Sequence, residues 1–375
     1  LKELIDKLGY PFLGGNVFDT EWDEPVFEST VFFEKGGVSI AVIGQHFPYT
    51  PIANPSYMVE GWSFGIRPEV LQKNVNKAKK QGAEIVVLLS HNGFDVDQKL
   101  AAMINGIDVI LTGHTHDAIP KGIRIKDTLL LSSGSHGKYL GRVDLKVKNG
   151  KVVDTSSNLI PVFSDIIPPD PDMTKMINEI RAPYQDECDR AIGETETLLY
   201  RRGNFNGSWD DVICNTIMQE RDTEISLSPG FRWGTTLLPG QKITIDDIYS
   251  QTSMNYPEVY RIEMTGKMIK ELLEDVCDNI FNPDPFFQQC GDMVRVGDLT
   301  YTCHPKNKIG NRISDLRMIS SGKTIESNKK YVVGGWGSVN PNVKGPAIYN
   351  LLENYISEKK IIKKSNLEAV KIVGM

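Results

Sequence analysis

The sequence predicts a two-part α/β protein, in which a layered sheet domain is joined by a helix to a second α/β domain. Short apolar runs alternate with amphipathic helical segments through residues 1–165, and a second such series occupies residues 191–375. Between them, the proline-rich stretch 167–171 interrupts regular structure. With 375 residues, the chain is long enough for two domains of ordinary size. We therefore expect domains at 1–165 and 191–375, with a linker helix within 166–190.

The first domain is expected to contain a sheet covered by helices. Its clearest helix begins with Pro68 at a first-turn position, continues to Gln81 and is closed by Gly82. The continuous apolar runs around it are typical of strands that are buried on both faces. The expected strands are 39–44, 85–89, 107–111, 128–131 and 141–148, with a short helix over 98–104.

The second part of the chain continues the α/β pattern. The polar stretch 173–190 predicts the linker helix. Thr265 is a suitable N-cap for a helix whose apolar residues recur at helical spacing as far as Val276. We also expect a helix over 209–219 and strands over 224–227, 259–264, 294–302, 313–319 and 331–334.

Charge and composition exclude several classes of protein. The net charge of −6 and the pI of about 5.7 argue against a nucleic-acid partner, which needs a concentrated basic face. No apolar run approaches the roughly 18 residues that a membrane-spanning helix needs. The five cysteines form no C-x-x-C pair, so a zinc ribbon or a thioredoxin-like site is not indicated. Buried structural thiols are the favoured interpretation.

Histidines follow two of the predicted strands. The segment 112–117, with His114 and His116 two residues apart, directly follows strand 107–111, and the segment 90–93, with His91, follows strand 85–89. Side chains at the carboxyl ends of parallel strands gather at one edge of the sheet, where α/β proteins bind ligands. If these strands are neighbours, the histidines reach the same rim. Because histidine is the commonest neutral ligand of divalent transition metals, the combination predicts a metal site.

Other side chains near these loops have more than one interpretation. Asp117 could orient a histidine from behind, and so could Asn92 and His136 near the same sheet edge. A lone histidine after a strand is more often a hydrogen-bonded structural residue. This second interpretation is kept for His46 and His304, and as an alternative for His136.

Three histidines do not complete a two-metal hydrolase site, which also needs a bridging carboxylate and further ligands. Asp19, Asp23, Asp95 and Asp97 are available, but none follows a buried strand as a bridging aspartate should. The chain begins at Leu1 inside an amphipathic pattern typical of a helix already under way. We therefore expect the catalytic residues and the remaining ligands to lie upstream of Leu1.

Several motifs resemble those of a known superfamily. Ser-His-Asn at 90–92 and Gly-His-Thr-His at 113–116 resemble the third and fourth metal motifs of the calcineurin-like metallophosphoesterases. The later half of the chain resembles the C-terminal domain of 5′-nucleotidases. Further stretches are similar to the SoxB family of thiosulfohydrolases, so the resemblance covers almost the whole chain. These stretches are 31–35, 43–45, 48–55, 88–95, 108–118 and 228–234.

The resemblance implies a layered metallophosphoesterase domain of the αββα type with two divalent metal ions. The ions are usually manganese in SoxB, although such sites also accept zinc, iron or cobalt. By motif matching, His91 and His114 would serve one ion and His116 the other. The family's D-x-H motif, its bridging aspartate and its G-N/H-x-E motif would precede Leu1.

The resemblance also suggests how the second domain would bind substrate. Arg232 stands where 5′-nucleotidases carry a substrate-binding arginine, and Asn255 ends a segment similar to a second nucleoside-binding motif. A third such motif is replaced by residues 334–340, which weakens a nucleotide assignment. A guanidinium can hold phosphate or sulfonate with two parallel donors, unless Arg232 belongs to a structural ion pair. Trp233 and Trp336 are candidate pocket walls, with structural burial as the alternative.

The family resemblance implies hydrolysis of a cysteine S-thiosulfonate on the C-terminal arm of the SoxYZ carrier, in the periplasm, by a hydroxide that bridges the metals. Two alternatives stay open: a 5′-nucleotidase or other phosphoesterase with the same metals, and an inactive carrier-binding module. Because loss of the first strands would expose sheet edges, we also expect residues 1–375 alone to be poorly folded and inactive.

Overall fold

The chain divides into two compact units, and each unit has its own apolar core. Unit 1 comprises Leu1–Pro169 with Asp284–Phe286, and unit 2 comprises Asp170–Pro283 with Phe287–Met375. Every helix in the described part of the chain is too short or too polar to cross a lipid bilayer. The computed structural model describes residues 1–201, 203–231, 234–289, 291–363 and 369–374.

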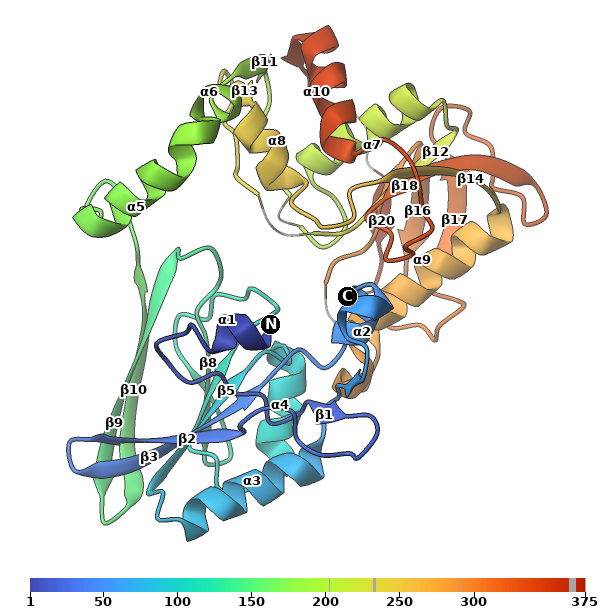
Figure 1. Ribbon diagram of the computed structural model, residues 1–375. Coiled ribbons are helices and arrows are strands. Elements are labelled where there is room, and N and C mark those ends of the chain that lie inside the picture. The colour runs from blue at the N-terminus through green and yellow to red at the C-terminus, as the bar shows by residue number, and fades with distance from the viewer. Residues whose placement is uncertain (202, 232–233, 290, 364–368, 375) are drawn as a thin grey trace. The chain divides into compact units, whose positions relative to one another are not determined.

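Unit 1 is built on a six-stranded mixed sheet with the strand order β2-β3-β5-β6-β8-β7 (Figure 1). The four central strands are parallel, and the two edge strands run antiparallel to their neighbours. The parallel strands are rich in valine, isoleucine and leucine, as expected of strands with buried faces. The strands are β2 Thr30–Lys35, β3 Val38–Gln45, β5 Ile85–Ser90, β6 Val109–Thr112, β7 Ile123–Ile125 and β8 Thr128–Ser132.

Two helices, α3 (Pro68–Lys80) and α4 (Phe94–Met103), pack on one face of this sheet (Figure 1). Their apolar residues meet those of the central strands in a single core that includes the fully buried Ile110. The opposite face is less covered, since Leu89 is 51% exposed and Leu111 is 37% exposed. The apolar core of unit 1 therefore lies between the sheet and these two helices, where apolar area is removed from water.

A long β-hairpin and several short elements complete unit 1. The hairpin pairs β9 (Tyr139–Lys148) with β10 (Lys151–Pro161). Both turn residues have positive φ, 54° at Asn149 and 69° at Gly150, as the Asn-Gly pair of a tight hairpin turn requires. The short elements are α1 Lys2–Ile5, β1 Phe18–Asp19, α2 Thr50–Ala53, the 3-10 helix η1 Ser56–Met58 and β4 Trp62–Ser63.

Unit 2 contains a four-stranded sheet with the order β14-β18-β12-β15 and two three-stranded sheets, β17-β16-β20 and β13-β11-β19. Strand β12 is parallel to β18 and antiparallel to β15. The helices are α5 Pro171–Arg181, η2 Ala182–Tyr184, α6 Gln185–Cys188, α7 Ser208–Arg221, α8 Ile245–Gln251, α9 Gly266–Phe281 and α10 Ile348–Lys359. The strands are β11 Ala191–Thr195, β12 Ile225–Ser228, β13 Lys242–Thr244, β14 Val259–Thr265, β15 Arg295–Gly297, β16 Leu299–Cys303, β17 Ile313–Met318, β18 Lys330–Trp336, β19 Ile361–Ile362 and β20 Val370–Ile372.

The predicted α/β class and two-part architecture are confirmed. The N-cap prediction is also confirmed, because the Thr265 hydroxyl accepts a hydrogen bond from the Met268 amide at 3.2 Å. The helix predicted over 98–104 is wrong at its start, since α4 already begins at Phe94 directly after Gly93, which adopts a φ of 104°.

Two other predicted elements are interrupted. The linker segment expected as one helix over 173–190 contains a 3-10 turn between α5 and α6, where Pro183 lacks the amide hydrogen that a continuous helix needs. The strand expected over 294–302 is divided into β15 and β16 at Asp298, which adopts a left-handed φ of 57°.

Candidate active site

The carboxyl ends of four neighbouring strands in unit 1 form a continuous polar rim. Strands β3, β5, β6 and β8 are paired so that Gln45 lies beside Ser90, Ser90 beside Thr112, and Thr112 beside Ser132. The two histidine loops therefore follow adjacent strands, as a shared site requires. We refer to these four residues and the loops that follow them as the polar rim.

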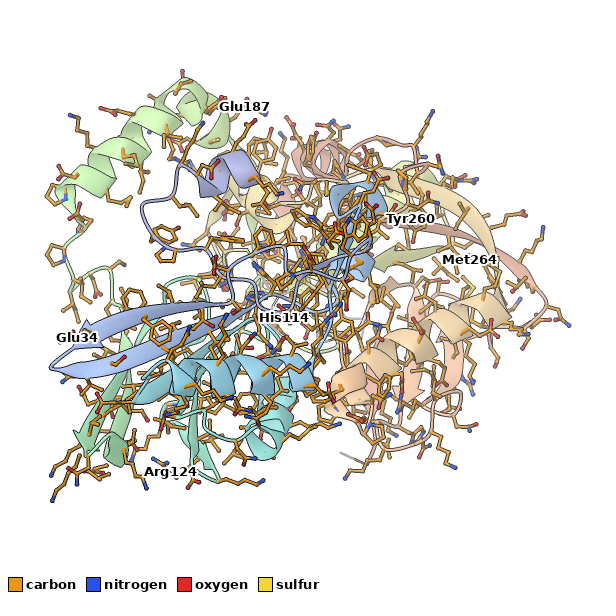
Figure 2. The ribbon with its side chains drawn as sticks, turned by 60° about the horizontal axis from the view of Figure 1, so that its bottom comes forward. Glu34, His114, Arg124, Glu187, Tyr260 and Met264 are labelled. Atoms are coloured by element: carbon orange, nitrogen blue, oxygen red, sulfur yellow. The ribbon has the colours of Figure 1, made fainter. Side chains whose placement is uncertain are left out.

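Two histidine rings lie next to each other at the polar rim. The ring centroids of His91 and His114 are 5.2 Å apart, and the ring planes meet at 67°. Phe47, from the loop after β3, stacks on His114 with the centroids 4.0 Å apart and the planes at 21°. Figure 2 shows His114 at the end of the sheet opposite Glu34, which lies in the β2–β3 hairpin. The rim therefore presents two imidazoles against an aromatic wall.

The backbone of the histidine loops is strained. The φ angle is 75° at His114, 61° at His116 and 59° at His136, in a left-handed region that residues other than glycine seldom adopt. Such strain persists only where the surroundings impose it, and it concentrates at functional sites. The rings of His116 and His136 are 5.8 Å apart with their planes at 78°. The structure thus brings the predicted supporting residue His136 beside the predicted ligand His116.

The structure also places two further sequence candidates. The Asp117 carbonyl accepts hydrogen bonds from Ser132 Oγ at 2.5 Å and from the Gly134 amide at 2.8 Å, so Asp117 ties the loop after β6 to the loop after β8. Its expected role in orienting a histidine stays a prediction. His304 lies in unit 2 with its Nε2 atom 3.1 Å from Ser314 Oγ, in agreement with its structural interpretation.

His46, which was given a structural interpretation, lies close enough to His91 for the two rings to interact electrostatically. Its ring packs against Phe12 and Phe27, with centroids 5.0 Å and 5.8 Å away. Burial and the charge of nearby His91 both lower the pKa of His46. Burial likewise lowers the pKa of His91. Both imidazoles are therefore neutral at pH 7, and the neutral form is the one that can bind a metal ion.

A buried polar network lies beneath the first histidine loop. Asn92 is fully buried, and its Nδ2 atom donates to Gln45 Oε1 at 2.7 Å and to Asp97 Oδ1 at 3.1 Å. Asp97 is also fully buried. Burial raises the pKa of Asp97 to about 6, against the hydrogen bonds from Ser90 and Asn92 that lower it. The supporting role predicted for Asn92 thus has a physical basis, whereas Gln45 and Asp97 were not predicted to take part.

These donors fit part of a divalent-metal site. Neutral imidazoles are common ligands of divalent transition metals, and His91 and His114 present two of them side by side. Among the described residues, no group of three or more His, Cys, Asp or Glu side chains is placed to hold a metal ion. His91 and His114 thus offer two donors of the kind that such a site needs. The ligand roles of His91, His114 and His116 stay predictions.

In unit 2, the candidate substrate-binding loop follows β12. Arg232 and Trp233, which were predicted to contact substrate, lie outside the described residues. The loop just before them is closely packed, because a Cβ atom on Gly230 would lie 2.3 Å from the Met293 carbonyl oxygen. Asn255, the third predicted contact, is exposed in the loop after α8.

Trp336 belongs to the core of unit 2. Its side chain is only 3% exposed and packs within an apolar cluster. Its indole Nε1 atom donates to Ser228 Oγ at 2.8 Å, and its ring meets that of Phe231 at 5.9 Å and 80°. The structure therefore favours the structural alternative for Trp336, in which the indole holds the loop after β12 rather than lining a pocket.

Two arginines and two aspartates hold the same loop from the side of the core. Arg201, Asp210, Asp292 and Arg295, which we call the buried ion network, are each between 2% and 6% exposed. Asp210 accepts from Arg201 Nε at 2.9 Å and from Arg295 Nε at 3.1 Å, and Arg295 also contacts Asp292 at 3.0 Å. Arg201 then donates to the Pro229 carbonyl at 3.0 Å. The network thus fixes the backbone that leads to Arg232.

Comparisons with known proteins match one part of the chain to a domain family and the whole chain to a solved structure. The 5′-nucleotidase C-terminal domain family matches residues 191–337. A solved structure of the sulfate thiohydrolase SoxB of Thermus thermophilus, in complex with glycerol, aligns with a TM-score of 0.95 at 34% identity. That alignment covers 100% of this chain and 70% of the SoxB chain.

Curated relatives match shorter parts of the chain. The uncharacterized metallophosphoesterase YunD of Bacillus subtilis is 34% identical over 149 residues, which are 39% of this chain and 31% of YunD. The snake venom 5′-nucleotidase of Crotalus adamanteus is 26% identical over 220 residues, which are 50% of this chain and 36% of the venom enzyme. The matches therefore span about a third of the length of these relatives.

The fold, the domain match and the solved SoxB structure agree with one another. The relatives are hydrolases of the metallophosphoesterase and 5′-nucleotidase superfamily, whose members use divalent metal ions. With 34% identity over its whole length and over 70% of the SoxB structure, this chain belongs to the SoxB family of that superfamily.

Proposed function

We propose that the full-length protein is a thiosulfohydrolase that releases sulfate from a cysteine S-thiosulfonate on a carrier protein. The observation that carries this proposal is the 34% identity to the SoxB sulfate thiohydrolase across the whole of this chain. In the reaction, the oxygen of water bonds to the terminal sulfone sulfur while the bond from that sulfur to its neighbouring sulfur breaks. Sulfate leaves, and the neighbouring sulfur stays on the carrier cysteine.

The polar rim of unit 1 would provide ligands for the metal ions of this reaction. His91 and His114 would hold one divalent ion and His116 a second, with manganese as the proposed metal. When bound, such ions act as Lewis acids and lower the pKa of water. Phe47 stacks on His114 and so restricts the plane of its ring. Arg232 would hold the sulfonate oxygens with two parallel N–H donors.

Residues 334–340 support a substrate other than a nucleoside. Trp336 in this segment is 3% exposed, so little of its ring is left to stack on a base. Gly337 adopts a φ of 72°, and a Cβ atom there would lie 2.7 Å from the Pro229 side chain. Both residues therefore contact the loop after β12, and the segment contributes packing where a nucleotidase would carry a nucleoside-binding motif.

Family membership also suggests the partner and the compartment. We propose the cysteine-bearing C-terminal arm of the SoxYZ carrier as the substrate and the periplasm as the location. The net charge of −6 argues against a nucleic-acid partner and is compatible with a peptide substrate.

Product analysis tests the proposed function. The full-length protein is loaded with manganese and given a thiosulfonate-modified peptide of the carrier arm, and sulfate is measured. We expect sulfate release, and we expect His114→Ala to abolish it while His304→Ala, in unit 2, retains it. Metal-loaded protein that releases no sulfate from any carrier-bound thiosulfonate would overturn the proposal.

A 5′-nucleotidase activity is the second candidate. The domain match over residues 191–337 favours it, as does the 26% identity to a venom 5′-nucleotidase. The same experiment with AMP in place of the peptide distinguishes the two candidates. Phosphate from AMP without sulfate from the peptide would establish the nucleotidase and reject the thiosulfohydrolase.

A further inference from the structure

We propose that Asp97 is a positioning residue, which sets the orientation of the His91 and His114 loops without contacting metal or substrate. This inference rests on the proposed ligand role of the two histidines. Asp97 belongs to α4, whose other inward-facing residues, such as Val96 and Leu100, pack in the apolar core. Asp97 is as deeply buried as these neighbours, yet its carboxylate contacts the polar rim instead of the core.

The Asp97 carboxylate holds both neighbours of His91 in the chain. Its Oδ1 atom accepts from Ser90 Oγ at 2.8 Å and from Asn92 Nδ2 at 3.1 Å. The Ser90 hydroxyl in turn accepts from the Asn92 amide at 3.1 Å. The residue between them, His91, is therefore flanked on both sides by groups bonded to one oxygen atom.

The same network reaches the loops after β3 and β6. Asn92 Nδ2 also donates to Gln45 Oε1 at 2.7 Å, and the His91 amide donates to the Gln45 carbonyl at 3.0 Å. On the other side, the Gly113 amide donates to the Ser90 carbonyl at 2.9 Å, which joins the start of the loop after β6 to Ser90. Through Ser90 and Asn92, the Asp97 carboxylate is thus connected to the loops that carry Phe47, His91 and His114.

Burial of a carboxyl group at this position is unfavourable for folding, so packing alone does not explain the residue. A carboxyl group removed from water loses its hydration, and within the described residues no Lys, Arg or His forms an ion pair with Asp97 to offset that loss. An apolar residue of similar size would fill the space, but it would leave the Ser90 and Asn92 donors without an acceptor. The carboxylate is therefore explained by the loops it orders.

Imidazole NMR tests the inference in the metal-free, full-length protein labelled with ¹⁵N-histidine. Residues 1–375 contain six histidines, and single histidine substitutions assign the ring signals of His91 and His114. We expect Asp97→Leu to shift the ring signals of His91 and His114 and to leave those of His136 and His304 unchanged. Asp97→Asn retains an oxygen at the Oδ1 position, so it should restore the wild-type signals.

A second variant separates positioning from stability. Val96→Ala removes apolar contacts of the same helix in the core and leaves the polar groups of the rim in place, so it should lower the melting temperature without shifting the two histidine signals. Mn²⁺ titration should show binding about 10- to 100-fold weaker for Asp97→Leu than for Asp97→Asn.

Equal shifts of all histidine signals in Asp97→Leu, or unshifted His91 and His114 signals, would overturn the inference. If the wild-type protein binds no divalent ion, the proposed function is contradicted but the role of Asp97 is not. The histidine signals of the metal-free protein test that role separately.

Discussion

The polar rim of unit 1 and the loop after β12 in unit 2 are both held by buried polar side chains, but the charges are arranged differently. Beneath the rim, Asp97 is a single carboxyl group surrounded by hydroxyl and amide donors. Beneath the loop, Asp210 lies between the guanidinium groups of Arg201 and Arg295. The first arrangement can lose its charge by binding a proton, whereas in the second the arginines stay charged at every relevant pH.

This difference predicts how each region responds to change. Burial raises the pKa of both Asp97 and Asp210, but at Asp210 the two arginines oppose the effect of burial. A lone buried carboxyl group makes stability depend on pH. A compensated network makes stability depend on each partner, because removal of one leaves the others charged and buried. The four predictions below test this contrast, beginning with the largest effect.

Removal of the charge on Asp210 should cause the largest loss of stability. Asp210→Asn leaves Arg201 and Arg295 in the core without the anion they share, and breaking a buried pair of this kind costs about 3–5 kcal/mol. The measurement is the free energy of unfolding in urea, followed by tryptophan fluorescence, to which Trp209, fully buried next to Asp210, contributes.

The control for Asp210→Asn is an exposed ion pair in the same unit. Glu263 contacts Lys330 at 2.8 Å, with 61% and 66% of their side chains exposed. Glu263→Gln should leave the urea midpoint unchanged, because water and salt already screen such a pair. An equal loss of stability in the two variants would show that the buried ion network stabilises unit 2 no more than an exposed ion pair does.

Asp97 should make the stability of unit 1 depend on pH. Its folded-state pKa of about 6 lies above its ordinary value of 3.8, so the folded state holds the proton more tightly than the unfolded state. The stabilisation from this group is therefore fully present below pH 3.8 and is lost as the pH rises through about 6. At about 1.4 kcal/mol per pKa unit, the loss is about 3 kcal/mol.

Asp97→Asn removes this titration and is the matched comparison. The difference in unfolding free energy between wild type and Asp97→Asn should change between pH 4 and pH 7, with the variant gaining relative stability as the pH rises. Denaturant unfolding at a series of pH values measures it. A constant difference across that range would show that the Asp97 carboxyl group does not titrate there.

Gly230→Ala should disturb the loop in unit 2 by steric contact rather than by charge. The new Cβ atom would lie 2.3 Å from the Met293 carbonyl oxygen and 2.6 Å from that of Asp292, so the backbone must move. Such overpacking typically costs about 1–3 kcal/mol, and it should reduce turnover because Arg232 is two residues away. Gly9→Ala, which would meet nothing within 4 Å, is the control and should leave both stability and turnover unchanged.

The sequence could predict the central strands and the histidines that follow them, because both signals are local. Buried parallel strands are continuous apolar runs, and a polar residue at the carboxyl end of each marks the rim. The same rule applied to β3 would have identified Gln45 and Phe47, since both follow an apolar run as His91 does. Strand β10 was missed because its sequence is largely polar and gives no clear apolar pattern.

The supporting networks could not be predicted, because they join residues that are far apart in the chain. Arg295 and Asp210 are separated by 85 positions, and nothing near either residue in the sequence indicates the other. Asp97 resembles an ordinary acidic residue in the first turn of a helix, where it would be favourable in water. Only the packing of α4 on the sheet shows that its side chain is buried. The expectation that residues 1–375 alone fold poorly stays a prediction.

The smallest effects should come from the removal of single hydroxyl groups. They distinguish the polar rim from the loop after β12, because only the stability of the rim should depend on pH. Ser90→Ala removes a donor to Asp97 at 2.8 Å, and Ser228→Ala removes the acceptor for Trp336 Nε1 at 2.8 Å. Each should cost about 1 kcal/mol at pH 7. The Ser90 hydrogen bond lowers the pKa of Asp97, so its loss should move the pH-dependent fall in stability to higher pH, while Ser228→Ala should not. Unfolding measured for both variants across the pH series decides this, and a pH shift in Ser228→Ala equal to that in Ser90→Ala would mean that the titration is not a property of the polar rim.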